Sequence, residues 1–319
     1  MESTASVSQI NILAQKLRDN VQQVIVGKDD VIDLMLVALL CKGHALVEDV
    51  PGIGKTTLAK ALAQSLGCTF KRVQFTPDLT PPDILGVHFY NQKSGEFQFR
   101  PGPVFAQILL ADEINRATPR TQSSLLEAMQ EQQVTLDGEN MPLPSPFLVI
   151  ATQNPIEMEG TFPLPEAQLD RFLVRVRLGY PTQEEESGIL LRFQKESQVP
   201  SIEPVVTVEE LQSMQSSVED VRVDDSLREY IVQITHASRE HSSLQLGASP
   251  RAALAHYKAS QAIAALSGRD YVLPDDIKQM ALHALGHRLI PTSQARLRGR
   301  STDEIVAEIL SSVDVPIER

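Results

Sequence analysis

Residues 44–66 read HALVEDVPGIGKTTLAKALAQSL and join a short apolar run to a helix through a glycine-rich loop. The apolar run, Ala45 to Val47, predicts a strand, and the Ala- and Leu-rich run from Lys55 to Leu66 predicts a helix. A loop in this position directs several backbone N–H groups at one point, which suits the β- and γ-phosphates of a nucleotide. Lys55 adds positive charge there, and the Thr56 hydroxyl can bind Mg²⁺. The stretch therefore predicts a P-loop that binds ATP.

The loop departs from the pattern Gly-x-x-x-x-Gly-Lys-Ser/Thr at its first position, where Asp49 stands in place of glycine. The first residue of such a loop usually sits at its base rather than against phosphate, so we interpret Asp49 as a tolerated turn residue. The expected nucleotide-binding residues of this segment are Asp49, Val50, Pro51, Gly52, Ile53, Gly54, Lys55, Thr56 and Thr57.

A second apolar stretch, Val104 to Ala111, runs directly into the adjacent carboxylates of Asp112 and Glu113. An apolar strand that ends in two acidic residues supplies what phosphoryl transfer still lacks beside a P-loop. We expect Asp112 to hold the shell of the metal ion and Glu113 to polarise the attacking water. Together the two segments predict a chain that binds ATP with Mg²⁺ and hydrolyses the nucleotide.

The composition of the 319 residues, 42% hydrophobic and 22% charged, is ordinary for a soluble globular protein of one large or two smaller domains. A formal charge of −12 argues against broad electrostatic attachment to nucleic acid or anionic membrane, and leaves a local basic patch open. Cys41 and Cys68 lack metal-ligand spacing, which argues against a disulfide framework or a zinc site. His283 and His287 have helix-face spacing for a metal, but no third ligand accompanies them.

The start of the chain, Met1 to Asn11, lacks the basic residues and apolar run of a signal peptide. The longest apolar stretch, Val31 to Cys41, is interrupted by Asp33 and is far shorter than the ~20 residues needed to cross a bilayer. We therefore expect no membrane span and a cytoplasmic protein.

Apolar strands alternate with helices through the first half of the chain, which predicts an α/β fold. Such an alternation implies a three-layer, mostly parallel sheet that binds ligands at the carboxyl ends of its strands. Helical spacing before this part begins predicts two further helices, one through Ile10 to Val24 and one over Asp29 to Cys41. The candidate strands are His44 to Val47, Thr69 to Phe75, Ala106 to Asp112, Phe147 to Thr152 and Phe172 to Leu178.

No convincing strand follows Tyr180, and the rest of the chain shows only helical patterns. Pro181 is the natural hinge, because proline and the residue before it disfavour helix. The predicted domains are an α/β nucleotide-binding core at 1–181 and a helical lid at 182–319. The expected lid helices are Glu184 to Glu196, Val208 to Val218, Asp225 to His241, Pro250 to Leu266 and Pro274 to His287.

Two inserts interrupt the alternation of strands and helices. Residues 86–101, GVHFYNQKSGEFQFRP, alternate apolar and polar residues on both sides of a central turn and predict a hairpin. Residues 134–146 predict a second one around Asp137-Gly138. Each could simply cover a sheet edge. The first carries aromatic residues that favour contact with a partner: Phe89, Tyr90, Phe97 and Phe99.

Three further polar residues stand where a nucleotide site could use them. Asn154 follows the fourth strand and could orient the water beside Glu113, or it is only a turn residue before proline. Arg171 lies at the entrance of the fifth strand, which suits a role in a neighbouring subunit; the alternative is an ion pair with Asp170 or Glu166. Arg251 lies in the first turn of a helix, where the helix dipole disfavours a cation. An external anion such as the γ-phosphate would explain this unfavourable position. The alternative is that Arg251 is simply solvated or ion-paired.

The segments from Glu48 to Arg251 strongly resemble the MoxR family of AAA+ ATPases. The resemblance is carried by VEDVPGIGKT, QFTPDLTPPDILG, FRPGPVFAQILLADEINRA, ATQNPIEMEGTFPLPEAQLDRF and GASPRA, in this order. It implies an AAA+ core with a helix-2 insert at about residues 86–101, a helical lid, and assembly into a ring, commonly a hexamer, around ATP.

Residue by residue, the resemblance implies the Walker A, Walker B, sensor and arginine-finger roles of this superfamily. It assigns Lys55 and Thr56 to Walker A, Asp112 and Glu113 to Walker B, Asn154 to sensor 1, Arg171 to the arginine finger and Arg251 to sensor 2. Arg116 and Arg120 stay open as alternative fingers. We also count Val26 and Gly27 among the expected nucleotide-binding residues.

The resemblance further implies a chaperone-like protein that remodels or matures partner proteins, often partners with von Willebrand factor type A domains. Two alternatives stay open. A nucleotide-gated scaffold would bind ATP and display a surface with little hydrolysis, which the presence of both Glu113 and Asn154 disfavours. A DNA remodeller is disfavoured by the net charge of −12.

Overall fold

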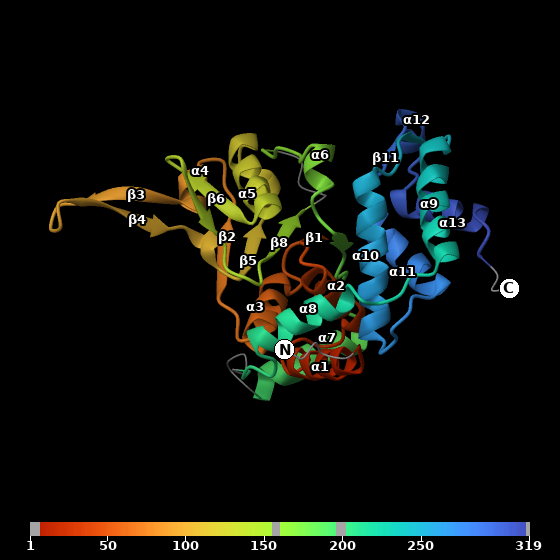
Figure 1. Ribbon diagram of the computed structural model, residues 1–319, viewed down its shortest axis with the longest axis horizontal. Helices are drawn as coiled ribbons and strands as arrows, with labels where there is room; N and C mark the ends of the chain where they lie inside the picture. Colours follow the sequence, from red (N-terminus) through yellow and green to blue (C-terminus); the bar gives the residue numbers. More distant parts are fainter. Residues whose placement is uncertain (1–6, 155–159, 196–201, 317–319) are drawn as a thin grey trace.

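The computed structural model describes residues 7–154, 160–195 and 202–316. A parallel sheet with helices on both faces lies beside a group of helices formed by the last third of the chain (Figure 1). The main sheet consists of β1 (Ala45–Glu48), β2 (Phe70–Gln74), β5 (Ile108–Asp112), β8 (Leu148–Gln153) and β9 (Val174–Val176). The helices of this first part are α1 (Val7–Val21), α2 (Asp29–Leu40), α3 (Lys55–Ser65), α4 (Pro81–Leu85), α5 (Pro119–Glu131) and α6 (Glu166–Leu169), with short 3₁₀ turns at Pro103–Phe105 and Ile114–Arg116.

The order of the sheet is β2-β5-β8-β1-β9, and every pairing is parallel. Each strand overlaps one candidate strand of the sequence; β2, β5 and β9 fall within theirs, whereas β1 and β8 each extend one residue further, to Glu48 and Gln153. β1 lies between β8 and β9, with Ala45 opposite Ile150 on one side and Val174 on the other. In a parallel sheet all carboxyl ends meet at one edge, so the segments that follow β1, β5 and β8 come together.

Alternate residues of the inner strands face opposite sides of the sheet, as a period of two requires. In β5, Leu109 packs with α5 residues in one core cluster, whereas Leu110 packs with residues of α2 and α3 in the other. Both side chains have no exposed surface. This two-sided burial explains why the strands appear in the sequence as continuous apolar runs.

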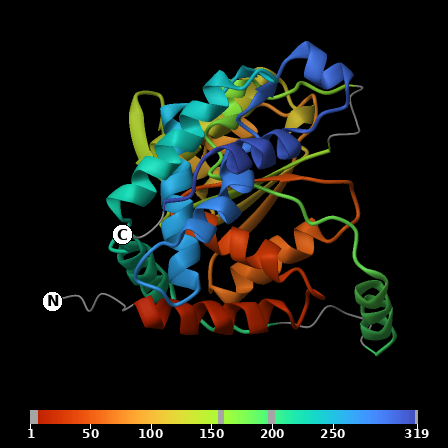
Figure 2. The ribbon, with the colours of Figure 1, turned by 90° about the vertical axis from the view of Figure 1, so that its right-hand side faces the viewer.

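The later part of the chain is mainly helical and packs against α1 and α2. Its central helix, α10, contacts α1, α2, α9 and α11, and small buried side chains such as Ala255 and Ala259 allow these helices to approach closely. Figure 2 shows α7 (green, lower right) apart from the other helices. The helices here are α7 (Gln183–Lys195), α8 (Val208–Val218), α9 (Asp225–Glu240), α10 (Pro250–Leu266), α11 (Pro274–Leu285), α12 (Ser293–Leu297) and α13 (Thr302–Ser312).

One element of this region contradicts the expectation that no strand follows Tyr180. A small antiparallel pair joins β10 (Leu244–Leu246) to β11 (Ile290–Pro291). With three and two residues, neither strand is long enough to show a period of two in the sequence, and Pro291 argues against a strand. The pair ties the loop before α10 to the loop after α11.

Both predicted hairpins are present. The first, β3 (Gly86–Asn91) and β4 (Glu96–Pro101), projects from the body of the molecule (Figure 1), and the second is β6 (Gln133–Leu136) with β7 (Glu139–Pro142). At the base of the first, Gly86 has φ +104°, and a Cβ there would lie 2.5 Å from the Arg100 carbonyl oxygen. Only glycine fits this crossing of two backbones.

Within the described ranges, no helix is long and apolar enough to span a membrane.

Candidate nucleotide-binding site

Three segments converge at the carboxyl edge of the sheet: the phosphate loop after β1, the acidic pair after β5 and the end of β8. The Asp49 N–H donates to the Gln153 carbonyl at 3.1 Å, which joins the loop to β8. Thr152 of β8 in turn reaches the acidic pair, because its hydroxyl donates to Asp112 Oδ1 at 2.6 Å. The two sequence motifs that predicted ATP binding therefore lie side by side.

The phosphate loop has the open, left-handed backbone that an anion cradle needs. Gly52 and Gly54 have φ angles of +86° and +92°, which residues with a side chain rarely adopt. No heavy atom lies within 4 Å of the position a Cβ would take at either glycine, so the space in front of the loop is free. Gly54 is also the N-cap of α3 and offers no side chain to its first N–H groups. These donors fit a triphosphate.

Lys55 lies near three carboxylates of the site. Its Nζ donates to the Asp49 carbonyl oxygen at 2.9 Å. Burial lowers the pKa of Lys55, and the charges of Asp112, Asp49 and Glu113 oppose that shift. A triphosphate in the loop would add further negative charge beside the ammonium and favour its protonated form.

The carboxylate of Asp49 has structural partners of its own. Its Oδ2 accepts hydrogen bonds from the backbone N–H groups of Leu178 and Gly179, the latter at 3.0 Å. These residues follow β9 and precede the predicted hinge at Pro181. Asp49 therefore links the phosphate loop to the segment that leads to the helical region, which is more than the tolerated turn residue inferred from the sequence.

Asp112 is buried and held on both carboxylate oxygens. Besides the bond from Thr152 to Oδ1, Arg72 of β2 donates to Oδ2 through Nη2 at 2.6 Å. Among the described residues no group of three acidic, histidine or cysteine side chains could hold a metal by itself. Mg²⁺ usually takes one or two protein oxygens and completes its shell with phosphate and water. Thr56 and Asp112 fit that donor set.

Glu113 has a strained backbone conformation and is bonded to three neighbouring side chains. Its φ is +57°, a left-handed value that costs a residue with a side chain on the order of 1 kcal/mol or more. The carboxylate Oε2 accepts from Gln74 Nε2 at 2.6 Å and lies 3.0 Å from Arg116 Nε. Its N–H donates to the Thr152 hydroxyl at 2.8 Å. The expected water-activating group is thus engaged by its own chain.

Three of these contacts were not foreseen from the sequence, namely those of Gln74, Arg116 and Thr152. Gln74 is the last residue of β2, and a polar end on a strand could have drawn attention to it. Arg116 was considered only as an alternative arginine finger, and its ion pair with Glu113 of the same chain makes that role less suitable. Asn154 lies at the same edge, one residue after Gln153 of β8.

The turn at Val26 and Gly27 is packed against the start of α7. Lys28 donates from Nζ to the Tyr180 carbonyl oxygen at 3.1 Å and forms an ion pair with Glu185 at 3.4 Å. A Cβ at Gly27 would lie 1.9 Å from Glu185 Oε1. Tyr180 follows the two residues that bind Asp49, so this turn is connected to the phosphate loop through residues 178–180.

Arg171 and Arg251 lie together, but at the opposite edge of the sheet. They line a cavity of about 140 Å³ with His44, Met129 and Gln130, and His44 directly precedes the first residue of β1. The phosphate loop follows the other end of this strand, ~13 Å away at 3.3 Å per residue. The two arginines therefore face away from the phosphate loop of their own chain.

Neither arginine has an ion pair or a hydrogen bond from its side chain to any described residue. The Nε atom of Arg171 is buried without a partner. The alternative ion pairs considered for Arg171 are not formed: Asp170 pairs with Arg288 instead, at 2.8 Å. Two free guanidinium groups beside one cavity are suited to an external anion.

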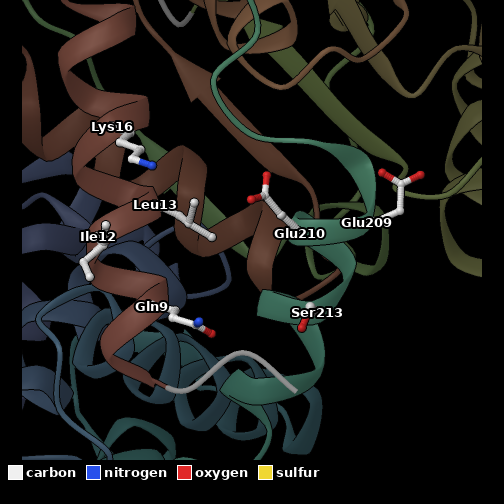
Figure 3. Close-up of a pocket in the computed structure, with 7 residues that line it drawn as sticks. All are labelled: Gln9, Ile12, Leu13, Lys16, Glu209, Glu210 and Ser213. Atoms are coloured by element: carbon white, nitrogen blue, oxygen red, sulfur yellow. The ribbon is translucent and has the colours of Figure 1, made fainter. Parts of the chain in front are cut away.

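A larger hollow elsewhere does not belong to this site. It has a volume of about 550 Å³ and lies between α1 and α8 (Figure 3), and its lining includes Ile12 and Leu13 of α1 and Glu210 and Ser213 of α8. None of its lining residues belongs to the phosphate loop, the acidic pair or the arginine cavity.

Comparisons with known proteins agree with this geometry. Residues 44–174 match the model of the ATPase family associated with various cellular activities (AAA), and residues 236–309 match an AAA lid domain. The chain is 52% identical over 307 residues to an uncharacterized protein, YeaC, of Bacillus subtilis, with 96% of each chain covered. It is 43% identical over 305 residues to the chaperone MoxR1 of Mycobacterium tuberculosis, with 93% of this chain and 80% of the relative covered.

A solved structure of a predicted ATPase from Cytophaga hutchinsonii superposes with a TM-score of 0.91 at 39% identity, over 98% of this chain and 97% of the other. The parallel sheet, the helical lid and these relatives agree with the fold and the resemblance inferred from the sequence. The chain belongs to the MoxR family of AAA+ ATPases.

Proposed function

We propose that this protein hydrolyses ATP, with Mg²⁺, at interfaces between its own copies and uses the turnover to remodel or mature partner proteins. One observation carries the proposal. The phosphate loop and the acidic pair lie at one edge of the sheet, whereas Arg171 and Arg251, whose side chains pair with no described residue, lie at the opposite edge. Each copy thus has two complementary halves of an ATPase site that cannot meet within one chain.

At the carboxyl edge, the backbone N–H groups near Gly52 and Gly54 bind the β- and γ-phosphates and Lys55 neutralises their charge. Thr56 and Asp112 would hold a Mg²⁺ ion, which would supply positive charge against the phosphate oxygens. Glu113 polarises the attacking water once its carboxylate leaves Gln74 and Arg116. These roles follow from the residue types and their contacts.

At the amino edge, Arg171 and Arg251 stabilise the transferring phosphoryl group of a neighbour's nucleotide. Contact between two different faces of the same chain is head-to-tail, and such contacts close into a ring when the rotation allows. Six copies is the number that the family resemblance implies. A cytoplasmic location, expected from the sequence, is part of the proposal.

The β3–β4 hairpin is the surface we propose for contact with protein clients. It projects from the body, and Tyr90 and Phe97 near its tip pack edge to face with large exposed surfaces of 55% and 74%. Clients with von Willebrand factor type A domains are the class that the resemblance suggests. A DNA substrate finds little support in a chain of net charge −12.

The experiment that tests the proposal mixes two inactive variants, Glu113→Gln and Arg171→Ala. In a mixed ring, an Arg171→Ala copy still has Glu113 and can receive Arg171 from a Glu113→Gln neighbour. Random mixing in equal amounts makes about a quarter of the interfaces complete in a head-to-tail ring. ATP turnover that recovers on mixing supports the proposal.

Turnover that stays absent on mixing would contradict a shared site. Tight ATP binding without turnover in the parent protein, at any protein concentration, would instead support the nucleotide-gated scaffold. The amount of ATP hydrolysed per copy should rise with protein concentration if assembly completes the site.

A further inference from the structure

The guanidinium of Arg288 is buried at the junction between the helical lid and the start of β9. Only 3% of its side chain is exposed. Nη2 donates to the carbonyl oxygens of Phe172 at 2.6 Å and Asp170 at 3.1 Å, and Nη1 donates to that of Leu173 at 3.3 Å. One side chain thus holds the backbone on both sides of Arg171.

The carboxylate of Asp170 continues this network to the start of α10. Oδ1 lies 2.8 Å from Arg288 Nε in an ion pair, and Oδ2 accepts from the Ser249 hydroxyl at 3.1 Å. Ser249 is the N-cap of α10 and accepts from the Ala252 N–H at 3.1 Å. The buried charge is therefore bonded to the residue that begins the helix of Arg251.

The positions of these residues in the chain connect the network to both free arginines. Asp170 directly precedes Arg171, and Ser249 stands two residues before Arg251. Both arginine heads line one cavity and bind no described side chain or backbone group. The backbone beneath each of them is fixed, whereas the guanidinium groups stay available.

Arg288 itself is not free to bind an anion. Its Nη atoms donate to the carbonyl oxygens of residues 170, 172 and 173 and to that of Ala284 in α11, and its Nε pairs with Asp170. Burial lowers the pKa of Arg288 to about 10, while Asp170 opposes the shift, so the group stays charged at neutral pH. It acts as a buried charged anchor.

Attachment of the lid does not depend on Arg288 alone. His287 donates from Nε2 to the Phe172 carbonyl oxygen at 3.0 Å, and His283 approaches the Arg175 carbonyl oxygen at 3.0 Å through Nδ1. The two histidines with metal-like spacing thus bind the backbone around β9. A conservative change of Arg288 leaves these contacts in place.

We infer that Arg288 is a positioning residue that, through Asp170 and Ser249, sets the spacing of Arg171 and Arg251 at the neighbour's phosphates. The inference rests on the proposed function, because it needs the two arginines to act on the next copy. A change of Arg288 should therefore impair the two arginines that a copy presents to its neighbour's nucleotide. It should leave the copy's own nucleotide-binding site intact.

The test uses Arg288→Lys in the full chain. Lysine keeps the charge opposite Asp170 but has no planar fork to hold three carbonyl oxygens at once. We expect kcat to fall about tenfold to a hundredfold, as for a small misplacement of catalytic groups. ATP affinity, measured with a fluorescent ATP analogue, should stay within about twofold. A fall in affinity as large as the fall in kcat would overturn the inference.

Mixing experiments distinguish positioning from general damage. Arg288→Lys mixed with Glu113→Gln should regain turnover, because the first variant offers an intact acidic pair and the second offers intact arginines. Arg288→Lys mixed with Arg171→Ala should gain nothing beyond its own residual turnover, since both lack the same half of the site. Failure of the first pair to recover, or recovery of the second, would overturn the inference.

The pair Glu113→Gln and Arg171→Ala is the reference. If that pair fails to recover, the proposed shared site fails, and with it the inference. If it recovers while Arg288→Lys with Glu113→Gln does not, only the role of Arg288 is overturned. Should Arg288→Lys fail to fold, Asp170→Asn removes the other half of the ion pair at nearly constant size and must give the same mixing pattern.

Discussion

The two edges of the central sheet hold their functional side chains in opposite ways. At the carboxyl edge, Asp112 and Glu113 are bound on their carboxylates by residues of neighbouring strands and turns. At the amino edge, the side chains of Arg171 and Arg251 bind no other residue that the structure describes, whereas the backbone around Arg171 is held by Arg288. We expect the carboxylate of Glu113 to need a conformational change before it can act on water, because residues of its own chain bind it. The guanidinium groups of Arg171 and Arg251 need only an anion to bind.

The largest expected effect comes from the amino edge. Arg171→Ala should lower ATP turnover by about 10³-fold or more, the range of an arginine that acts on a neighbour's phosphate. ATP affinity should change little, because the arginine cavity lies away from the phosphate loop of its own chain. Steady-state turnover and nucleotide titration measure the two quantities.

Weakened ATP binding by Arg171→Ala would contradict the contrast between the edges, because it would indicate that Arg171 contacts the nucleotide of its own chain. Normal turnover would move the finger role to Arg120, because Arg116 pairs with Glu113.

At the carboxyl edge, Glu113→Gln should lower turnover by about 10²- to 10⁴-fold, because the water loses its general base. ATP binding should remain. Lys55→Ala is the matched contrast, and it should weaken binding itself because a positive charge beside the phosphates is removed. Equal losses of affinity in the two variants would contradict the separate roles of these residues.

Acidic pH should lower the free energy of unfolding through His44, which lies at the amino edge. The pKa of His44 is lowered to about 4 by burial, against an opposing hydrogen bond to Met129. Its Nδ1 accepts from the Val149 N–H at 3.0 Å, which requires the neutral ring. The unfolded chain binds a proton on this histidine more readily than the folded chain does. The contribution of neutral His44 to the free energy of unfolding is therefore fully present above pH ~6.5, and up to about 3 kcal/mol of it is lost as the pH falls toward 4.

Denaturant unfolding at pH 7 and pH 5 measures this loss, and His44→Gln is the comparison. A buried amide has no proton to gain, so the variant should lose less stability between the two pH values. His256, whose pKa is also lowered to about 4 by burial, contributes equally to both proteins. An identical pH dependence would show that His44 is not responsible.

The smallest effect is expected from Gln74→Ala. Removing the amide takes one of two partners away from Glu113 Oε2 and leaves the ion pair with Arg116, so turnover without a client should rise by up to about tenfold. Turnover of the variant and the parent at saturating ATP measures the change. A fall in turnover would mean that Gln74 orients Glu113 for the reaction. Glu113 would then be in its active position without having to leave Gln74.

The sequence predicted the main sheet, the phosphate loop and the acidic pair because each depends on local patterns. An apolar run that ends in Asp112-Glu113, or in a glycine-rich loop before Lys55, can be recognised without knowing the order of strands. The contacts that hold Glu113 could not be recognised. Gln74 and Thr152 lie 39 residues from it along the chain, and only the order β2-β5-β8 brings them together.

The arginine cavity was hidden for the same reason. Arg171 and Arg251 were each predicted to meet an anion, but nothing local shows that residues so far apart share one cavity. Arg288 gave no signal, since a buried arginine differs from an exposed one only in its surroundings. The domain boundary at 181/182 stays a prediction, because the helices of the lid share one apolar core with α1 and α2.

Asp49, which stands where the common P-loop pattern has glycine, connects the phosphate loop to the segment before the lid. With glycine at this position, the two hydrogen bonds from the backbone N–H groups of Leu178 and Gly179 to the phosphate loop would be absent. Here one carboxylate fastens the loop to the backbone that leads into the lid. The departure from the common P-loop pattern therefore gives the phosphate loop a direct link to the chain segment that enters the lid, and we expect any shift of the loop to be felt there first.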